Sequence, residues 1–297
     1  MQELYISKLS DYLGAIEKLK TYYPNQMLAN NPTSITFLYR GLSDKSYNLL
    51  PGLLRKQTDI YDEDNNYSVE NSTYLAFGKE RDILQAFIQE ASSIISLPSS
   101  DLSRWAEYAQ HYGVPTRLLD WSSNPLVALY FACRDKKDKV GCVWLLHSKN
   151  YERIPIADHP LPNMTRREIV AQIIEGSEDF IYPLVYTPFY VDTRMSAQSS
   201  YFMVWGAKNE PFEKMFSEEK FCMRLPETDN GIRSFGTHEV EALLFCFLVH
   251  ADTKQTILRE LDTIGINEKT LFPGLDGIGR YVERRYRFDY NELMLNL

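Results

Sequence analysis

The 297-residue sequence predicts an α+β fold built around a mixed or antiparallel β-sheet. Segments with apolar residues at helical spacing alternate irregularly with short β-branched and aromatic segments, not in the regular order of a parallel sheet. The chain is 44% hydrophobic and 24% charged, as globular proteins are. No internal repeat, low-complexity tract or Pro/Gly-rich linker divides it. We therefore expect a single domain over residues 1–297, with a helical addition at its N-terminus.

The first half of the chain predicts four helices and one strand. Apolar residues recur at helical spacing in residues 9–23, and residues 33–42 (TSITFLYRGL) are β-branched and aromatic up to Gly41. Residues 71–95 predict a long helix. Asp101 and the serines before it predict the cap of a helix that ends at Tyr112, before Gly113. Asn124 and Pro125 predict the start of another helix, because proline is preformed for the first turn.

The second half predicts more strands than helices. Residues 141–147 (GCVWLLH) read as a buried strand, and Thr165 with Glu168 forms a capping-box pattern before a helix at 165–175. Further strands are expected at 181–191, 200–205, 220–225 and 241–250. Asp252 predicts the cap of a helix that ends at Ile264, and the last helix is expected at 275–288.

Charge and composition exclude several classes of protein. A net charge of -8 and a pI near 5.3 argue against non-specific binding to nucleic acid or anionic membranes. The N-terminus lacks a basic start followed by an apolar run, and no apolar stretch reaches the roughly 20 residues that span a bilayer. Four cysteines without a CxxC pair indicate reduced thiols. We therefore expect a cytoplasmic protein without a membrane contact.

Arg40 is the first candidate for ligand binding. It ends the strand predicted at 33–42, directly before Gly41. A guanidinium at a strand end presents a rigid fork to phosphate or carboxylate, and a glycine lets a ligand approach the backbone. A structural ion pair that closes the strand end is the alternative.

The second candidate is the segment 110–132, QHYGVPTRLLDWSSNPLVALYFA, which carries many polar groups between two apolar stretches. The helix expected after Asn124 has free N–H groups at its N-terminus, and these can hold an anion. We expect these polar groups and Arg40 to share one cavity and to hold the pyrophosphate of a dinucleotide, while aromatic neighbours stack on a ring. The groups are His111, Arg117, Asp120, Ser122 and Ser123, and the aromatic neighbours are Tyr39, Tyr112 and Trp121.

Two alternatives remain open for this segment. The arginines can instead bridge buried carboxylates, and Asp120 and a serine can cap the following helix. Metal binding is not expected, because the five histidines show no HxxxH or HExxH spacing and no cysteine pair supplements them.

Together these motifs resemble the FRG domain family, which is named for a Phe-Arg-Gly motif. Tyr39 replaces the Phe of that motif here. The resemblance covers about residues 33–283, which leaves 1–32 as the helical N-terminal addition. It is carried by Tyr39-Arg40-Gly41, LLPGLLR at 49–55, AQHYGVPTRLLDWSSNPLVALYFA at 109–132, RMSAQSSYF at 194–202 and TLFPGLDGIGRYV at 270–282. The family occurs in bacterial and phage proteins and implies little about activity.

A second similarity, to the ADP-ribosyltransferases, implies a chemistry and a related sheet type. In that superfamily an aromatic-Arg-Gly ends a first strand, a serine- or threonine-rich segment follows, and a later strand carries a catalytic glutamate. LYRG and DWSSNPLVALYFA match the first two elements. Three residues are candidates for the catalytic glutamate of the third element: Gln198 in AQSSYF, and Glu239 and Glu241 in HEVEALLF. The catalytic candidates are Arg40, His111, Asp120, Gln198 and Glu241, and the NAD-binding candidates are Tyr39, Gly41, Arg117, Ser122 and Ser123.

Three functions fit the sequence. The first is an NAD-dependent ADP-ribosyltransferase, as in a bacterial toxin or anti-phage defence effector. Its substrate would be NAD, its acceptor a protein or nucleic acid, and its neutralising partner an antitoxin. No metal is expected in this case. The second is a nuclease-like hydrolase that uses His111 and Asp120 with a metal or an acidic partner. The third is a non-catalytic module that binds a nucleotide or a partner through its arginines.

Overall fold

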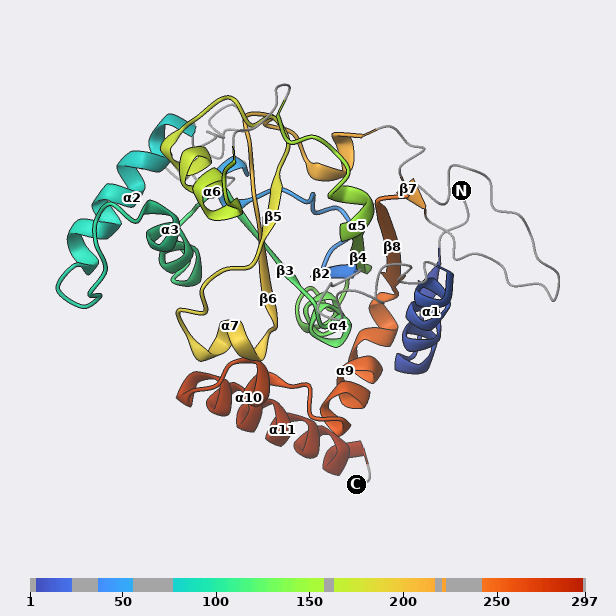
Figure 1. Ribbon diagram of the computed structural model, residues 1–297. Helices are drawn as coiled ribbons and strands as arrows, with labels where there is room; N and C mark the ends of the chain where they lie inside the picture. The colour runs from blue at the N-terminus through green and yellow to red at the C-terminus, as the bar shows by residue number, and fades with distance from the viewer. Residues whose placement is uncertain are drawn as a thin grey trace, which may run out of the picture.

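The computed structural model describes residues 4–22, 37–55, 77–157, 163–216, 221–222 and 242–295. The described residues form an α+β fold, in which eight strands make one mixed sheet (Figure 1). The strand order is β1-β8-β4-β2-β3-β6-β5, and β7 also pairs with β8. β1 and β7 run parallel to β8, and the other described pairs are antiparallel. The strands are β1 (Tyr5–Ile6), β2 (Phe37–Leu42), β3 (Leu118–Ser122), β4 (Gly141–His147), β5 (Leu184–Tyr186), β6 (Ser200–Val204), β7 (Phe221–Cys222) and β8 (Leu244–Val249).

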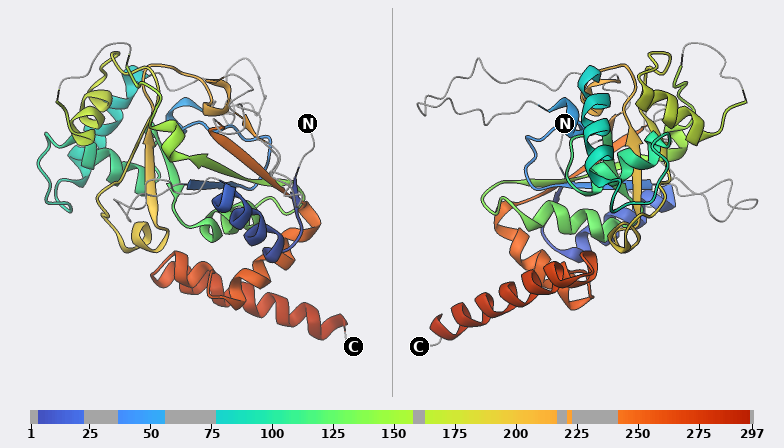
Figure 2. Two further views of the ribbon diagram at one scale, coloured as in Figure 1. Left: turned by 45° about the vertical axis from the view of Figure 1, so that its right-hand side comes forward. Right: turned by 90° about the vertical axis from the view of Figure 1, so that its left-hand side faces the viewer.

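Two groups of helices cover one face of the sheet side by side (Figures 1 and 2). The first group packs on β8, β4 and β2, and consists of α1 (Leu9–Tyr22), α4 (Pro125–Arg134) and α9 (Lys254–Thr263). The second packs on β3, β6 and β5, and consists of α2 (Phe77–Ala91), α3 (Leu102–His111) and α6 (Arg166–Glu175). The remaining α-helices are α5 (Ser148–Tyr151), α7 (Thr193–Ala197), α10 (Glu268–Leu271) and α11 (Leu275–Leu295).

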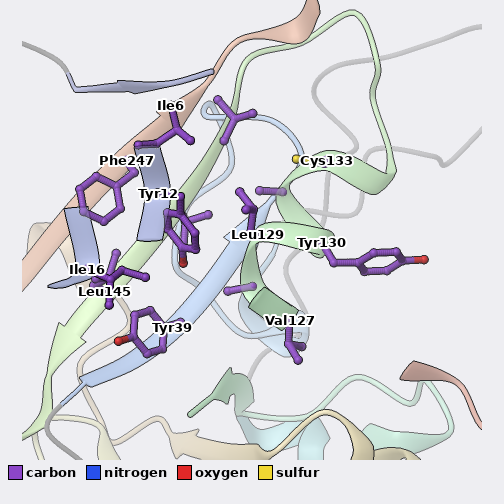
Figure 3. Packing of buried hydrophobic residues seen from close by; sticks show 14 of the residues in the cluster. Ile6, Tyr12, Ile16, Tyr39, Val127, Leu129, Tyr130, Cys133, Leu145 and Phe247 are labelled. Atoms are coloured by element: carbon purple, nitrogen blue, oxygen red, sulfur yellow. The ribbon is translucent and has the colours of Figure 1, made fainter. Parts of the chain in front are cut away.

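The strands are buried on both faces, and their side chains alternate between two cores. Tyr39 of β2 packs with Tyr12 of α1, Leu129 of α4 and Phe247 of β8 (Figure 3). Leu38, the preceding residue, packs on the opposite face with tryptophans and other residues of a second cluster. Because burial of this kind stabilises by roughly 25 cal/mol per Å² of apolar surface, these clusters are the main stabilising feature of the fold.

The described part of the N-terminal segment belongs to this core. β1 pairs with β8 at Tyr5 and Ile6, and Ile6, Tyr12 and Leu19 are at most 1% exposed. The addition that the sequence predicts as helical therefore also supplies a strand at the sheet edge.

Local sequence signals predicted most helix boundaries correctly. The carboxylate of Asp101 accepts a hydrogen bond from the Arg104 N–H, Thr165 and Glu168 form the expected capping box, and Asn124 caps α4. Asp252 is not the cap of α9, because it lies in a 3-10 turn (Ala251–Thr253) that precedes the helix. Of the strand expected at 181–191, only residues 184–186 form a strand, which pairs with β6.

β3 is the main element that the sequence analysis missed. Its five residues, LLDWS, lie in the segment 110–132, where no strand was predicted, yet they form a strand between β2 and β6. The segment is too short and too polar for a clear period-two pattern, and its pairing partners are distant in sequence. This strand brings Asp120 and Ser122 next to β2.

Candidate functional site

A cavity of about 270 Å³, called cavity 1 here, lies between the two helical groups, where β2 and β3 separate. In the described structure β2 pairs with β3 at Tyr39 and Ser122 alone, although β2 continues along β4 to Leu42. The unpaired stretch leaves room for side chains from several elements. The cavity is lined by Tyr39, Arg40 and Gly41 of β2, Gln110 and His111 of α3, Asp120, Trp121 and Ser122 of β3, Val127, Ala128 and Phe131 of α4, Arg194, Met195 and Gln198 at α7, and Ser200 and Phe202 of β6.

Arg40 bridges the two separating strands. Its Nη1 donates a hydrogen bond to the backbone carbonyl of Asp120 and lies 3.8 Å from Asp120 Oδ2. Its Nε is buried and has no hydrogen-bond partner among the described residues. Burial lowers the pKa of Arg40 to about 10, while Asp120 opposes the shift, so the side chain is a cation at neutral pH. A partly buried cation with an unused N–H donor is suited to an anionic ligand.

Asp120 is the carboxylate among the residues that line cavity 1. Its side chain is 54% exposed, and its Oδ2 accepts a hydrogen bond of 2.9 Å from Gln110 Nε2. Gln110 Oε1 in turn accepts from the hydroxyl of Thr116 at 2.7 Å. This chain of contacts fixes the carboxylate beside Arg40, as the sequence analysis predicted for this pair.

The structure corrects the expectation for Arg117. Its side chain does not line cavity 1 and is 5% exposed, paired with the buried carboxylate of Glu80. Glu80 Oε1 also accepts from the Arg117 backbone N–H at 3.0 Å, and Arg117 Nη1 reaches the carbonyl of Trp205. Arg117 therefore holds α2 against β3 and β6, which is the structural alternative that the sequence left open.

His111 lies at the C-terminal end of α3 with its Nε2 at 3.4 Å from Oδ2 of Asp192. Asp192 also caps α7, because its Oδ1 accepts from the Arg194 N–H at 2.6 Å, and this bond is the main cause that lowers the pKa of Asp192. Burial lowers the pKa of His111 below its usual value, although Asp192 opposes the shift. The imidazole is therefore neutral at pH 7, and Nδ1 is its basic nitrogen when Nε2–H faces Asp192.

Asp192 was not among the candidates from the sequence, which named His111 and Asp120 with an unspecified acidic partner. The signal that could have identified it is the sequence Asp192-Thr193-Arg194, in which an aspartate stands where a helix cap is preferred. Its approach to His111, 81 positions earlier in the chain, could not be read from that pattern.

The lowered pKa of His111 leads to a testable expectation. In an NMR titration, the His111 ring should titrate with a midpoint below 6.5, and Asp192→Asn should lower the midpoint further, because the variant removes the carboxylate that favours the charged ring. The His111→Gln variant, which lacks this ring, assigns the resonance. A midpoint at or above 6.5 in the wild type would contradict the neutral-imidazole assignment.

The N-terminus of α4 contributes fewer free donors than expected. Pro125 has no N–H, and the Leu126 N–H donates to Asn124 Oδ1 at 2.9 Å. Val127 and Ala128, the next two residues of the first turn, both line cavity 1. Neither Asp120 nor a serine caps this helix, so that alternative is wrong.

The two serines before α4 hold the turn instead. The Ser122 hydroxyl donates to the Gln198 carbonyl at 2.6 Å and accepts from the Asn124 N–H at 3.0 Å. The Ser123 N–H donates to the Ser199 carbonyl, and Ser123 is not among the residues that line the cavity. These bonds join the β3–α4 turn to α7, so Ser122 shapes the cavity wall.

Gly41 and Gln198 also have structural roles. A Cβ built on Gly41 would lie 1.8 Å from the carbonyl oxygen of Ala128, so the glycine admits the α4 backbone, whereas the sequence analysis expected a ligand there. Gln198 Nε2 donates to the Leu271 carbonyl at 3.0 Å and ties α7 to α10. Glu239 and Glu241 lie outside the described residues.

Within the described residues, no group of three or more His, Cys, Asp or Glu side chains is arranged to hold a metal ion. Among the same residues, no helix has the length and apolar character needed to cross a membrane.

Comparison with known proteins gives a family match for one part of the chain. Residues 35–140 match the family model of the FRG domain, which supports that resemblance over this range. The range includes Arg40, His111 and Asp120, whereas the stretches at 194–202 and 270–282 lie outside it. No curated protein and no solved structure matches the chain. None of these comparisons supports the similarity to ADP-ribosyltransferases.

Proposed function

We propose that cavity 1 binds NAD and that the protein transfers ADP-ribose from NAD to an acceptor. The observation that carries the proposal is the meeting of Arg40, Asp120 and His111 in one cavity at the separation of β2 and β3. These residues supply a cation, a carboxylate and a neutral base within one concave site. Transfer of ADP-ribose from a dinucleotide uses a cation to hold phosphate, a carboxylate to balance positive charge and a base to accept a proton.

The size of the cavity limits what it holds. At about 270 Å³ it lies just below the roughly 300–1,000 Å³ typical of small-molecule pockets. We therefore assign to it the nicotinamide ribose half of NAD and the adjoining phosphate. Trp121, Phe131 and Phe202 provide apolar walls for a flat ring.

The reaction breaks the bond between the ribose C1′ and the nicotinamide nitrogen, and nicotinamide leaves with the electron pair. A bond then forms between C1′ and the acceptor oxygen or nitrogen, while the acceptor proton passes to Nδ1 of His111. Arg40 holds the phosphate, and Asp120 balances the positive charge that develops at the ribose. Asp120 takes this role in place of Gln198, because an amide carries no negative charge and donates to Leu271.

The pairing of His111 with Asp192 at 3.4 Å favours a second candidate, a hydrolase that activates water. In that reaction Arg40 would hold a phosphodiester and His111 would take a proton from water. In this candidate Asp192 would be the acidic partner that the sequence left unspecified beside His111 and Asp120.

Incubation with NAD labelled in its nicotinamide and adenine moieties, with and without a cell extract as the source of acceptor, tests the proposal. We expect wild-type protein to release nicotinamide and label the extract, and His111→Gln to reduce the rate at least tenfold because the base is lost. His250→Gln is the matched control, since His250 is exposed and does not line cavity 1. Cleavage of single-stranded RNA without nicotinamide release would favour the hydrolase. Binding of NAD without turnover would indicate a non-catalytic module.

A further inference from the structure

A second cavity, of about 810 Å³, is lined by residues of α4, the following turn, α7, α10 and α11, and we call it cavity 2. Figures 1 and 2 show α10 and α11 lying below α7 and α4. Six basic and four acidic side chains line this cavity. An excess of positive charge in one concave site is unexpected in a chain of net charge -8, and it favours an anionic ligand.

Three guanidinium groups surround one aromatic ring in this cavity. The Cζ atoms of Arg134, Arg194 and Arg280 lie 5.6, 4.8 and 5.1 Å from the centroid of Phe272. Each cation is attracted by the ring, but the three guanidiniums repel one another. An anion bound among them would relieve this repulsion.

Some of the basic side chains are already paired. Arg134 lies 2.8 Å from Asp135, Arg284 contacts both Asp262 and Glu268, and Arg287 contacts Glu283.

Three cations of the lining have no such partner. In the described structure, no carboxylate lies within 4 Å of the charged groups of Lys137, Arg194 or Arg280. Arg194 Nε is also buried without a hydrogen-bond partner among the described residues. These three side chains are therefore available to a ligand.

The motif TLFPGLDGIGRYV at 270–282, which cavity 1 does not use, builds this site. A Cβ on Gly277 would lie 1.9 Å from the carbonyl oxygen of Phe272, so the glycine lets α11 start directly against the end of α10. The two ion pairs of Arg284 then hold α11 in place. On the opposite wall, Tyr130 points away from the other labelled side chains of the hydrophobic cluster, and its ring lines cavity 2 (Figure 3).

We propose that cavity 2 binds a small polyphosphate anion through Lys137, Arg194 and Arg280. Guanidinium forks match phosphate oxygens, and three unpaired cations fit two or more linked phosphates better than a single carboxylate. The ligand is either free pyrophosphate or the diphosphate of a nucleotide. This site is separate from the proposed NAD reaction, although Arg194 lines both cavities.

Calorimetric titration with pyrophosphate, ADP and adenosine tests this assignment. We expect pyrophosphate to bind the wild type and Arg280→Gln to weaken the affinity at least tenfold. Arg285→Gln is the matched control, because it removes the same charge from an exposed residue of α11 outside the cavity and should change the affinity less than twofold. Thermal unfolding of both variants verifies that they fold.

The remaining outcomes show whether the ligand is a nucleotide or free pyrophosphate, and whether it binds in cavity 2. ADP binding at least tenfold tighter than pyrophosphate would identify a nucleotide ligand, and equal affinities would identify the phosphates alone; both support the proposal. Binding lost in Arg40→Gln but kept in Arg280→Gln would place pyrophosphate in cavity 1 and overturn it. Three other results would also overturn the proposal. They are equal weakening in Arg280→Gln and Arg285→Gln, adenosine binding as tightly as ADP, and no measurable heat of binding with pyrophosphate at millimolar concentration.

Discussion

Replacement of Arg117 by methionine is expected to lower the free energy of unfolding by about 3–5 kcal/mol. The reason is that Glu80, which is 1% exposed, would remain buried without the guanidinium that it contacts. Denaturant unfolding at pH 7 measures the loss. Arg81→Met on the same helix is the matched control, because Arg81 is exposed and should change the free energy by no more than about 0.5 kcal/mol.

The pH dependence of this loss has a definite sign. Burial raises the pKa of Glu80, and Arg117 opposes the shift, so the pKa should rise further in Arg117→Met. A carboxyl that binds its proton more tightly in the folded state destabilises the fold increasingly as pH rises above its unfolded pKa. We therefore expect the variant to lose less stability at pH 5 than at pH 8.

Removal of the carboxylate together with the arginine completes the test. The double variant Arg117→Met, Glu80→Leu should be more stable than Arg117→Met alone, because no unpaired charge remains in the core. An Arg117→Met protein as stable as the wild type at pH 8 would show that this ion pair does not hold α2.

Replacement of Arg40 by glutamine is expected to weaken NAD binding by roughly 10- to 100-fold, because a hydrogen-bonded charge contributes about 1.5–3 kcal/mol. Isothermal calorimetry measures the change, and thermal unfolding checks that the variant folds. Arg40→Lys should recover only part of the affinity, since an ammonium keeps the charge but lacks the bidentate fork.

Arg153→Gln is the matched control for Arg40. Arg153 is exposed and does not line cavity 1. Its loss changes the net charge by the same amount, so NAD affinity should stay within about twofold of the wild type. Equal weakening by the two variants would mean that general electrostatic attraction, and not cavity 1, explains the binding.

Local signals in the sequence were enough for much of the fold. The strand Gly141–His147 forms where seven mostly apolar residues predict it, and α6 begins at the Thr165–Glu168 capping box. The sequence also placed Arg40 and Asp120 at one site, because both stand out as charges in apolar surroundings. The strand and the helix cap depend on residues within a few positions of one another, whereas the pairing of Arg40 with Asp120 spans 80 positions and was inferred from their polarity alone.

Tertiary packing decided the partners of the other candidate residues. Arg117 and Glu80 are 37 positions apart, and their pairing removed Arg117 from the cavity where its sequence neighbours lie. His111 met Asp192, not Asp120, because the cap of α7 packs against the end of α3. Gly41 leaves room for the backbone of α4, and this contact exists only when the helix is packed on the strand. The sequence determined which side chains can carry charge or bind an anion, whereas long-range packing determined which of them are neutralised in the core and which remain available in a cavity.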